Sequence, residues 1–197
     1  RREQAFPSPT LESVVRFVVS YARDSRLHLS YREEEIADFI AGLGASRLTI
    51  LQGMSGTGKT SLPKIVCEAL MGNCEIVEVE SSWRDKNELL GYYNEFSRTY
   101  TPRKFTQALY RACLDPDTVT LIVLDEMNLA RIEYYFAEML SVLEMPSKEE
   151  WVLDLVPTAW GGQAGAEAAQ HASVLRVGSR ASPLPGTDRR AYHTHPA

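Results

Sequence analysis

A glycine-rich octapeptide, GMSGTGKT at residues 53–60, constrains the fold of this chain more than any other feature. It follows a short apolar run, RLTILQ at residues 47–52, and it leads into a helical pattern at residues 59–71. Glycines allow such a loop to turn sharply and to present its backbone N–H groups without steric hindrance. The order of strand, loop and helix predicts an α/β fold in which residues 47–52 form a buried parallel strand.

The octapeptide has the residues that a loop needs to bind a nucleoside triphosphate with Mg²⁺. Backbone N–H groups ahead of a helix N-terminus provide positive potential without bulk. We expect Lys59 to reach the β- and γ-phosphates, as a catalytic residue, and the Thr60 hydroxyl to bind Mg²⁺. The alternative, a glycine-rich turn without a ligand, is disfavoured by the flanking strand and helix. The predicted nucleotide-binding residues of this Walker A loop are Gly53, Met54, Ser55, Gly56, Thr57, Gly58, Lys59, Thr60 and Ser61.

A second motif, VTLIVLDE at residues 119–126, is an apolar strand that ends in two carboxylates, a Walker B pattern. At the carboxyl edge of a parallel sheet, Asp125 would hold Mg²⁺ directly or through water, and Glu126 would act as the general base on the attacking water. The alternative is a strand that simply ends at a polar turn. Asn128 and Arg131 follow, and either could face the nucleotide or a neighbouring subunit, although for Arg131 a solvated surface charge is as good an interpretation.

Hydrophobic periodicity predicts the remaining elements. A first helix has Ser8 as its N-cap and Pro9 as its first residue, and a second begins at Ser30, with Ser30 and Glu33 as a capping box. Further predictions are a strand at residues 75–80, helices at 87–93 and 105–113, a strand at 119–124, and one helix with an apolar stripe of Leu129, Ile132, Phe136, Met139 and Leu143. Alternating strands and helices predict a three-layer fold with a parallel sheet.

Composition excludes several classes of protein. The net charge of -5 provides no basic field for non-specific nucleic-acid binding. No run approaches the roughly 18 apolar residues of a membrane span, and the N-terminus lacks a signal-peptide pattern, so we expect a cytoplasmic protein without a membrane association. Cys67, Cys74 and Cys113 have no metal-site spacing and are expected to be reduced thiols. His28, His193 and His195 form no metal-binding pattern.

The composition changes at residue 158. Half of residues 158–197 are Ala, Gly, Pro or Ser, which predicts a disordered tail. We therefore divide the chain into an N-terminal helical extension at residues 1–46, a nucleotide-binding core at 47–157 and the tail at 158–197. Because the chain begins with Arg1 rather than Met, we interpret it as a segment of a longer protein.

Together, GMSGTGKT, VLDEMNLAR and the helix IEYYFAEMLSVLE resemble the AAA+ ATPases, in particular the McrB-like branch close to the MoxR and midasin groups. The stretch SSWRDKNELLGYYN at residues 81–94 is also similar to that branch, and the resemblance covers residues 48–144. It implies NTP hydrolysis, with ATP favoured over GTP, coupled to conformational work in a homo-oligomeric ring that acts with a protein or DNA-processing partner. Trp83, Asp85, Tyr92 and Tyr93 could form a substrate-facing or intersubunit surface, but core packing is the favoured interpretation of these aromatic residues.

The chain departs from this family after the Walker B helix. A further central strand with a sensor residue, arginine fingers and a helical lid are not recognisable, so the predicted AAA+ core is incomplete. WVLDLV at residues 151–156 could form one arm of a hairpin, and SVLRV at 173–177 is a poor substitute for the missing strand. Without that strand, the backbone edges of the Walker A and Walker B strands would be unpaired, at about 1 to 3 kcal/mol for each buried group.

Two other functions fit parts of the sequence. A small-molecule P-loop kinase would need a lid and an acceptor site with several arginines, which the segment after Asp125 does not provide. A non-catalytic nucleotide-binding fragment, or pseudo-ATPase scaffold, would bind the triphosphate but not hydrolyse it, because arginine fingers are missing.

Overall fold

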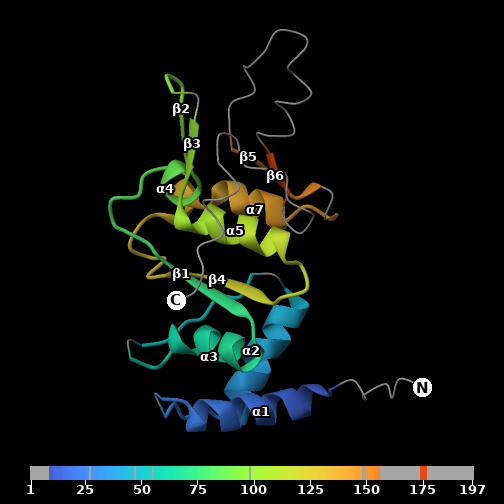
Figure 1. Ribbon diagram of the computed structural model, residues 1–197. Helices are drawn as coiled ribbons and strands as arrows, with labels where there is room; N and C mark the ends of the chain where they lie inside the picture. Colours follow the sequence, from blue (N-terminus) through green and yellow to red (C-terminus); the bar gives the residue numbers. More distant parts are fainter. Residues whose placement is uncertain are drawn as a thin grey trace, which may run out of the picture. The chain divides into compact units, whose positions relative to one another are not determined.

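The computed structural model describes residues 9–26, 28–46, 48–54, 56–97, 99–147, 150–155 and 174–176, and Figure 1 labels most of its helices and strands. The chain divides into two compact units, Arg1–Cys74 and Glu75–Ala197. The first unit contains the glycine-rich loop, and the second contains Asp125 and Glu126.

Three helices build the first unit: α1 (Leu11–Asp24), α2 (Glu33–Ala45) and α3 (Ser61–Ala69). Helix α1 packs against both α2 and α3. Apolar residues spaced three and four apart line the facing sides, because this spacing places them on one side of each helix. The buried residues of this core are Val15, Val18, Ala22, Ile36, Phe39, Leu62, Ile65, Val66, Cys67 and Ala69.

The first two helices exist as predicted but begin later than expected. The N-cap of α1 is Thr10, whose Oγ1 accepts a hydrogen bond from the Ser13 N–H at 3.2 Å, and the predicted cap, Ser8, lies outside the described residues. Helix α2 begins at Glu33, so Ser30 is not its cap. The N–H of Arg32 donates instead to the Glu35 carboxylate at 2.9 Å, which satisfies a main-chain donor at the helix start.

The strand predicted at residues 47–52 is wrong. Residues 48–52 have no regular secondary structure, and the side chains of Leu48 and Ile50 are 39% and 67% exposed. A strand needs a hydrogen-bonded neighbour, and none of the strands in the described part of the chain pairs with this segment. In the same segment, the buried Oγ1 of Thr49 has no hydrogen-bond partner among the described residues.

The sheet of the second unit is small. Strand β1 (Asn73–Glu78), which begins two residues before the unit boundary, pairs with β4 (Thr120–Asp125) in a parallel two-stranded sheet. Both strands lie close to the predicted positions. Among the described residues the other two sheets are separate antiparallel pairs, so the parallel sheet expected from the sequence is present there as two strands.

A hairpin interrupts the helix predicted at residues 87–93. Helix α4 (Asn87–Leu90) ends after one turn, and β2 (Gly91–Asn94) follows and pairs antiparallel with β3 (Thr99–Pro102). Gly91 explains the change, because its φ of 116° is disfavoured for other residues and a Cβ there would lie 2.3 Å from the Thr101 carbonyl oxygen. The prediction therefore holds for the first four residues and fails for the last three.

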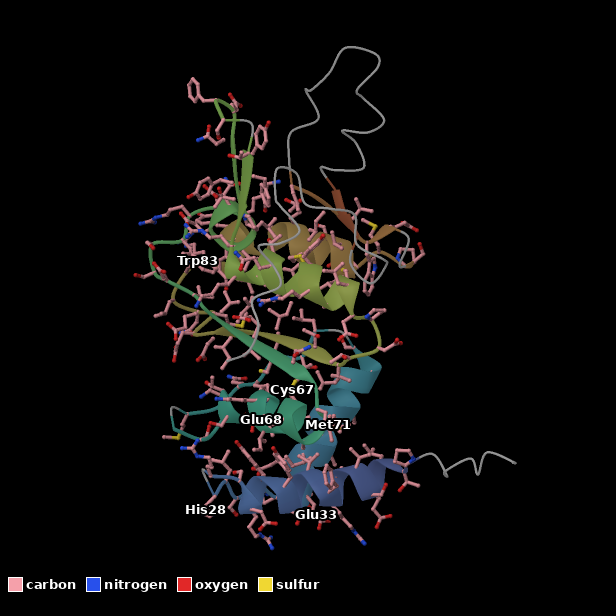
Figure 2. The ribbon with its side chains drawn as sticks, viewed as in Figure 1. His28, Glu33, Cys67, Glu68, Met71 and Trp83 are labelled. Carbon is pink, nitrogen blue, oxygen red and sulfur yellow. The ribbon has the colours of Figure 1, made fainter. Side chains whose placement is uncertain are left out.

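The helix predicted at 105–113 is confirmed as α5 (Lys104–Leu114). The single helix predicted from Leu129 to Leu143 is instead divided into α6 (Ile132–Tyr135) and α7 (Ala137–Leu143), with Phe136 at φ -115° and ψ -3° between them. Part of the apolar stripe is nevertheless buried, since Phe136 and Met139 lie in the core of the unit with Trp83, Leu89 and Tyr135. Ile132 and Leu143 are partly buried against this core, whereas Leu129 is 51% exposed. Figure 2 labels Trp83, whose ring meets that of Tyr135 edge-on with 5.2 Å between centroids.

Strand β5 (Val152–Asp154) pairs antiparallel with β6 (Val174–Arg176). Residues 152–154 of the predicted hairpin arm at 151–156 therefore form a strand, and residues 174–176 pair with it and not with β1 or β4. The rest of the predicted tail, 158–173 and 177–197, lies outside the described residues. No helix among the described residues is long and apolar enough to span a membrane.

Candidate functional site

The glycine-rich loop turns sharply before it enters α3. Gly56 has a φ of 80° and Gly58 a φ of 84°, a left-handed conformation that residues with a Cβ disfavour. The Thr57 hydroxyl donates to the Met54 carbonyl at 2.9 Å, which closes the loop on itself. Gly53, Met54, Gly56 and Thr57 are exposed, and Ser55 lies outside the described residues.

Lys59 folds back over this loop. Its Nζ donates to the carbonyl oxygens of Gly53 at 2.6 Å and of Met54 at 2.5 Å. These two hydrogen bonds hold the ammonium charge against the main chain at the beginning of the loop. The cation that the sequence assigns to the phosphates therefore lies within the loop itself.

Thr60 and Ser61 join the loop to helix α3. Thr60 is the N-cap and Ser61 the first helical residue, and both are partly buried. The first N–H groups of a helix have no partner within the helix, so this end of α3 offers donors and positive potential to an anion. Pro63 lies in the same turn, where its missing N–H removes no intrahelical hydrogen bond.

One further side chain touches the loop and was missed by the sequence analysis. The Tyr31 hydroxyl donates to the Gly58 carbonyl oxygen at 3.2 Å and is also hydrogen-bonded to the Ser61 side chain. Burial raises the pKa of Tyr31 above its ordinary value, the charge of Glu35 raises it further, and the Ser61 hydrogen bond opposes both. Nothing in the local pattern indicates this contact, because Tyr31 precedes α2 and lies far from the loop in sequence.

In the second unit, Asp125 ends β4 and Glu126 begins a turn. The Asp125 carbonyl accepts from the Val79 N–H at 3.0 Å, and its Oδ1 accepts from the Glu126 N–H at 3.1 Å. Glu126 has a φ of 53° and an exposed side chain, and its carbonyl accepts from the Leu129 N–H at 2.9 Å. A positive φ at a residue other than glycine is strained, and such strain is typical of functional turns.

Not all of the predicted site residues belong to one unit. The structure brings together the described residues of the loop with Tyr31 in the first unit, and Asp125 with Glu126 in the second. The predicted Mg²⁺ ligands, Thr60 and Asp125, belong to different units, so their shared site stays a prediction. Within the described residues, no group of three or more His, Cys, Asp and Glu side chains is placed to hold a metal ion by itself.

Arg131 lies beside a cavity of about 360 Å³ in the second unit. Its guanidinium is 5.8 Å from the centroid of the Tyr134 ring, and its Nη1 donates to the Tyr134 hydroxyl at 3.4 Å. Trp83, which also lines the cavity, is only 7% exposed and belongs to the core. Core packing therefore holds for Trp83, and Tyr93 is partly buried against the same core, whereas Tyr92 is 49% exposed on the hairpin.

Comparison with known families gives a match over residues 49–153, more than half of the chain. The matching family is described as AAA domain (dynein-related subfamily). The matched region begins just before the glycine-rich loop and ends within β5, so it includes both the loop and the Asp125–Glu126 pair. A search of curated proteins found no match.

Proposed function

We propose, from the premise that this chain belongs to the AAA domain family (dynein-related subfamily), that it binds ATP with Mg²⁺ and hydrolyses the terminal phosphate. Nucleotide binding and hydrolysis by an AAA+ module follow from the family. The preference for ATP over GTP is our proposal and rests on the use of ATP by most AAA+ relatives. The observation that carries the proposal is the loop at residues 53–60, with its two left-handed glycines and Lys59 directly before the N-terminus of α3.

Each predicted residue has a role in this reaction. The backbone N–H groups of the loop and of Ser61, the first residue of α3, bind the phosphate oxygens, and Lys59 exchanges its carbonyl partners for the β- and γ-phosphates. The Thr60 hydroxyl and the Asp125 carboxylate are oxygen donors of the kind that Mg²⁺ prefers, so the donor set fits this ion. When bound, Mg²⁺ neutralises charge on the β- and γ-phosphates.

Glu126 is the general base of the proposed mechanism. Its exposed carboxylate accepts a proton from the attacking water while a bond forms from the water oxygen to the γ-phosphorus. The bond from the γ-phosphorus to the bridging oxygen breaks, and ADP and inorganic phosphate leave. The McrB-like resemblance extends the proposal to a ring of subunits that couples this cycle to work on a protein or DNA-processing partner.

The nucleotide site is tested with Lys59→Ala. The variant should lose affinity for a fluorescent ATP analogue in the presence of Mg²⁺ by at least about tenfold, because hydrogen bonds to charged groups contribute about 1.5 to 3 kcal/mol each. Lys64→Ala is the matched control, since Lys64 is an exposed lysine on the same helix. Equal affinity of the wild-type chain and Lys59→Ala would falsify the assignment of the loop.

The catalytic role of Glu126 is tested with Glu126→Gln. We expect the variant to bind nucleotide as the wild-type chain does and to release phosphate at least about 100-fold more slowly, because loss of a general base removes about two to four orders of magnitude in rate. Glu133→Gln is the control, since Glu133 is an exposed glutamate on α6. If phosphate release is unchanged in Glu126→Gln, Glu126 is not the base.

A second candidate is a nucleotide-binding fragment that does not hydrolyse. The observation that favours it is the segment before the loop, where residues 48–52 have no strand partner among the described residues. In the described part of the chain, helix α3 follows the loop, but no paired strand precedes it. Tight binding of the ATP analogue together with phosphate release no faster than in Glu126→Gln would favour this candidate over the ATPase.

A further inference from the structure

We propose that Tyr31 is a positioning residue for the phosphate loop: its hydroxyl holds the Gly58 carbonyl and thereby directs the Lys59 N–H toward the bound phosphates. The inference rests on the proposed nucleotide site. Tyr31 lies outside the glycine-rich motif, on the segment between α1 and α2. Figure 2 labels His28 and Glu33, which lie on either side of Tyr31 in the chain.

Among the described residues, two groups donate hydrogen bonds to the Gly58 carbonyl oxygen. One is the Tyr31 hydroxyl at 3.2 Å, and the other is the Leu62 N–H at 2.9 Å, which forms a hydrogen bond of the first turn of α3. Together they fix the direction of this carbonyl. The peptide group is planar and trans, so a C=O group and the N–H group that follows it point in opposite directions. Fixing the Gly58 carbonyl therefore also fixes the Lys59 N–H.

The two hydrogen bonds to this carbonyl matter because residue 58 is a glycine. With a φ of 84°, Gly58 lies in a region that only glycine occupies readily, and glycine can also adopt many other conformations. The peptide between Gly58 and Lys59 can therefore rotate at little steric cost unless it is held. The Leu62 N–H provides one restraint from within α3, and Tyr31 provides a second from outside the loop and its helix.

The Tyr31 ring also lies directly against the loop. A Cβ added at Gly58 would be 3.0 Å from the Tyr31 hydroxyl oxygen and 3.3 Å from its Cε1. Since burial and the nearby Glu35 raise the pKa of Tyr31, its hydroxyl stays protonated at neutral pH and can donate. The phenol therefore combines close packing with a hydrogen bond that phenylalanine cannot make.

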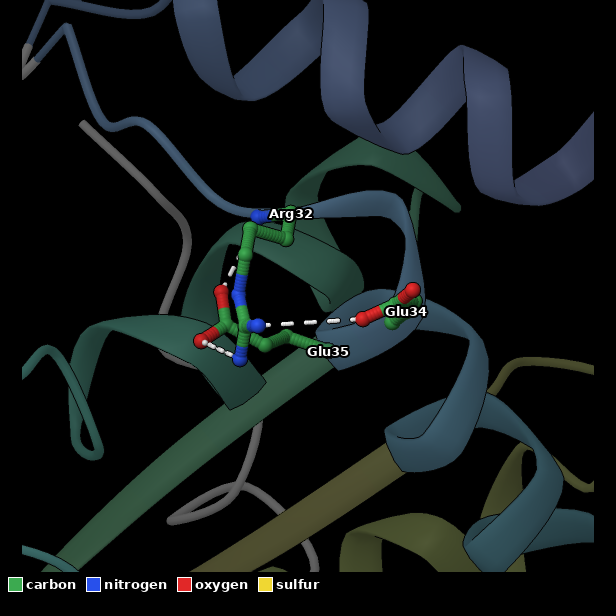
Figure 3. A network of polar contacts seen from close by, with 3 residues as sticks. All are labelled: Arg32, Glu34 and Glu35. Atoms are coloured by element: carbon green, nitrogen blue, oxygen red, sulfur yellow. Dashed lines mark hydrogen bonds and ion pairs between the residues drawn. The ribbon is translucent and has the colours of Figure 1, made fainter.

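Tyr31 is itself anchored by the residue that follows it. The Arg32 N–H donates to Glu35 Oε2 at 2.9 Å, and the Arg32 guanidinium bonds to Glu35 Oε1 at 3.0 Å (Figure 3). A longer ion pair of 3.7 Å joins Arg32 to Glu34. The Arg32 N–H contact ties the residue after Tyr31 to the first turn of α2, and the exposed ion pairs of the guanidinium add little to it.

The experiment is Tyr31→Phe, which keeps the ring and removes only the hydroxyl. Titration with the fluorescent ATP analogue and Mg²⁺ should give a Kd about two- to tenfold higher than that of the wild-type chain, the effect of one net hydrogen bond. The binding stoichiometry should be unchanged. Tyr21→Phe is the control, because Tyr21 lies on α1 in the same unit and is 37% exposed. An unchanged Kd, or a lower stoichiometry at the same Kd, overturns the proposal.

A second measurement separates this inference from the proposed function. Without the Tyr31 hydroxyl, the Gly58 carbonyl is less restrained and its hydrogen bond to the Leu62 N–H opens more often. Amide hydrogen exchange at Leu62 in the nucleotide-free protein should therefore be about two- to tenfold faster in Tyr31→Phe. If the wild-type chain binds no nucleotide, the proposed function fails, and Leu62 exchange still decides whether the hydroxyl holds the loop. Unchanged exchange contradicts the positioning role in either case.

Discussion

Residue 58 is subject to two independent constraints, one from the backbone and one from a neighbouring side chain. The φ of 84° disfavours any residue with a Cβ, and the Tyr31 hydroxyl lies 3.0 Å from the position that a Cβ would take. Gly44 differs in both respects, since it lies within α2 and a Cβ added there would have no neighbouring atom within 4 Å. The same substitution should therefore have opposite effects at the two glycines.

We predict that Gly58→Ala lowers the free energy of unfolding by about 1 to 2 kcal/mol, the cost of a left-handed conformation for an L-residue. Nucleotide affinity should fall as well, because the loop cannot keep its shape. Gly44→Ala should raise the free energy of unfolding by up to about 1 kcal/mol, since alanine is the better helix former. Urea unfolding of both variants measures these changes. A stable Gly58→Ala variant with wild-type affinity would mean that the loop does not need its left-handed residue.

At the scale of elements, the start of α2 is stabilised by an acidic side chain. The main-chain N–H of Arg32 and then its guanidinium bond to the Glu35 carboxylate, and these interactions lower the pKa of Glu35 below its ordinary value. A lowered pKa in the folded state means that the charged carboxylate stabilises the fold above its unfolded-state pKa of about 4.3. This contribution is lost as the pH falls through the lower, folded-state pKa.

Glu35→Gln should therefore be less stable than the wild-type chain at about pH 7 and should approach it at a pH low enough to protonate the Glu35 carboxylate of the folded wild-type chain. Urea unfolding at both pH values measures the two differences. Glu34→Gln serves as the control, because its ion pair with Arg32 is longer, at 3.7 Å, and 83% of the Glu34 side chain is exposed. A difference between wild type and Glu35→Gln that is the same at both pH values would contradict this assignment.

The elements that the sequence predicted correctly are those with strong local patterns. The observed bounds of helix α5 and strand β4 lie close to the predicted ones. Helical periodicity and a β-branched apolar run are properties of neighbouring residues, so the local sequence reveals them. The segment 48–52 also has a strand pattern, but a strand depends on a partner that local sequence does not show. Gly91 ends the helical pattern of α4 because it adopts a positive φ. Phe136 divides the next helical pattern because its backbone leaves the helical conformation between α6 and α7.

In the candidate site, too, the sequence predicts the residues that form local motifs and not the contacts made by the tertiary fold. The residues of the loop and the Asp125–Glu126 pair are adjacent in sequence, so their types and spacing reveal them. Tyr31 was missed because its contact with Gly58 is a property of the tertiary fold. The roles assigned to Lys59, Thr60, Asp125 and Glu126 remain predictions, and the variants described above test those of Lys59 and Glu126.

At the scale of the whole molecule, the proposed activity concerns several chains. If nucleotide sites form at subunit interfaces, as the AAA+ resemblance implies, phosphate release per chain should rise with protein concentration as rings assemble. Measurements at several concentrations, with sedimentation to follow assembly, test this. Glu126→Gln should assemble with nucleotide but not hydrolyse it. Phosphate release per chain that is constant across concentrations would be evidence against a ring-dependent ATPase.

The position of the Lys59 ammonium, bonded to the carbonyls of Gly53 and Met54, affects how binding data should be interpreted. Phosphate binding at this lysine is an exchange of acceptors, so the observed affinity reports the difference between phosphate and carbonyl partners rather than the full strength of either. The ammonium also cross-links the beginning of the loop to its end. A Lys59 variant therefore loses the hydrogen bonds that hold the loop together as well as a ligand for phosphate. Amide exchange in the nucleotide-free loop measures the first loss separately from the second.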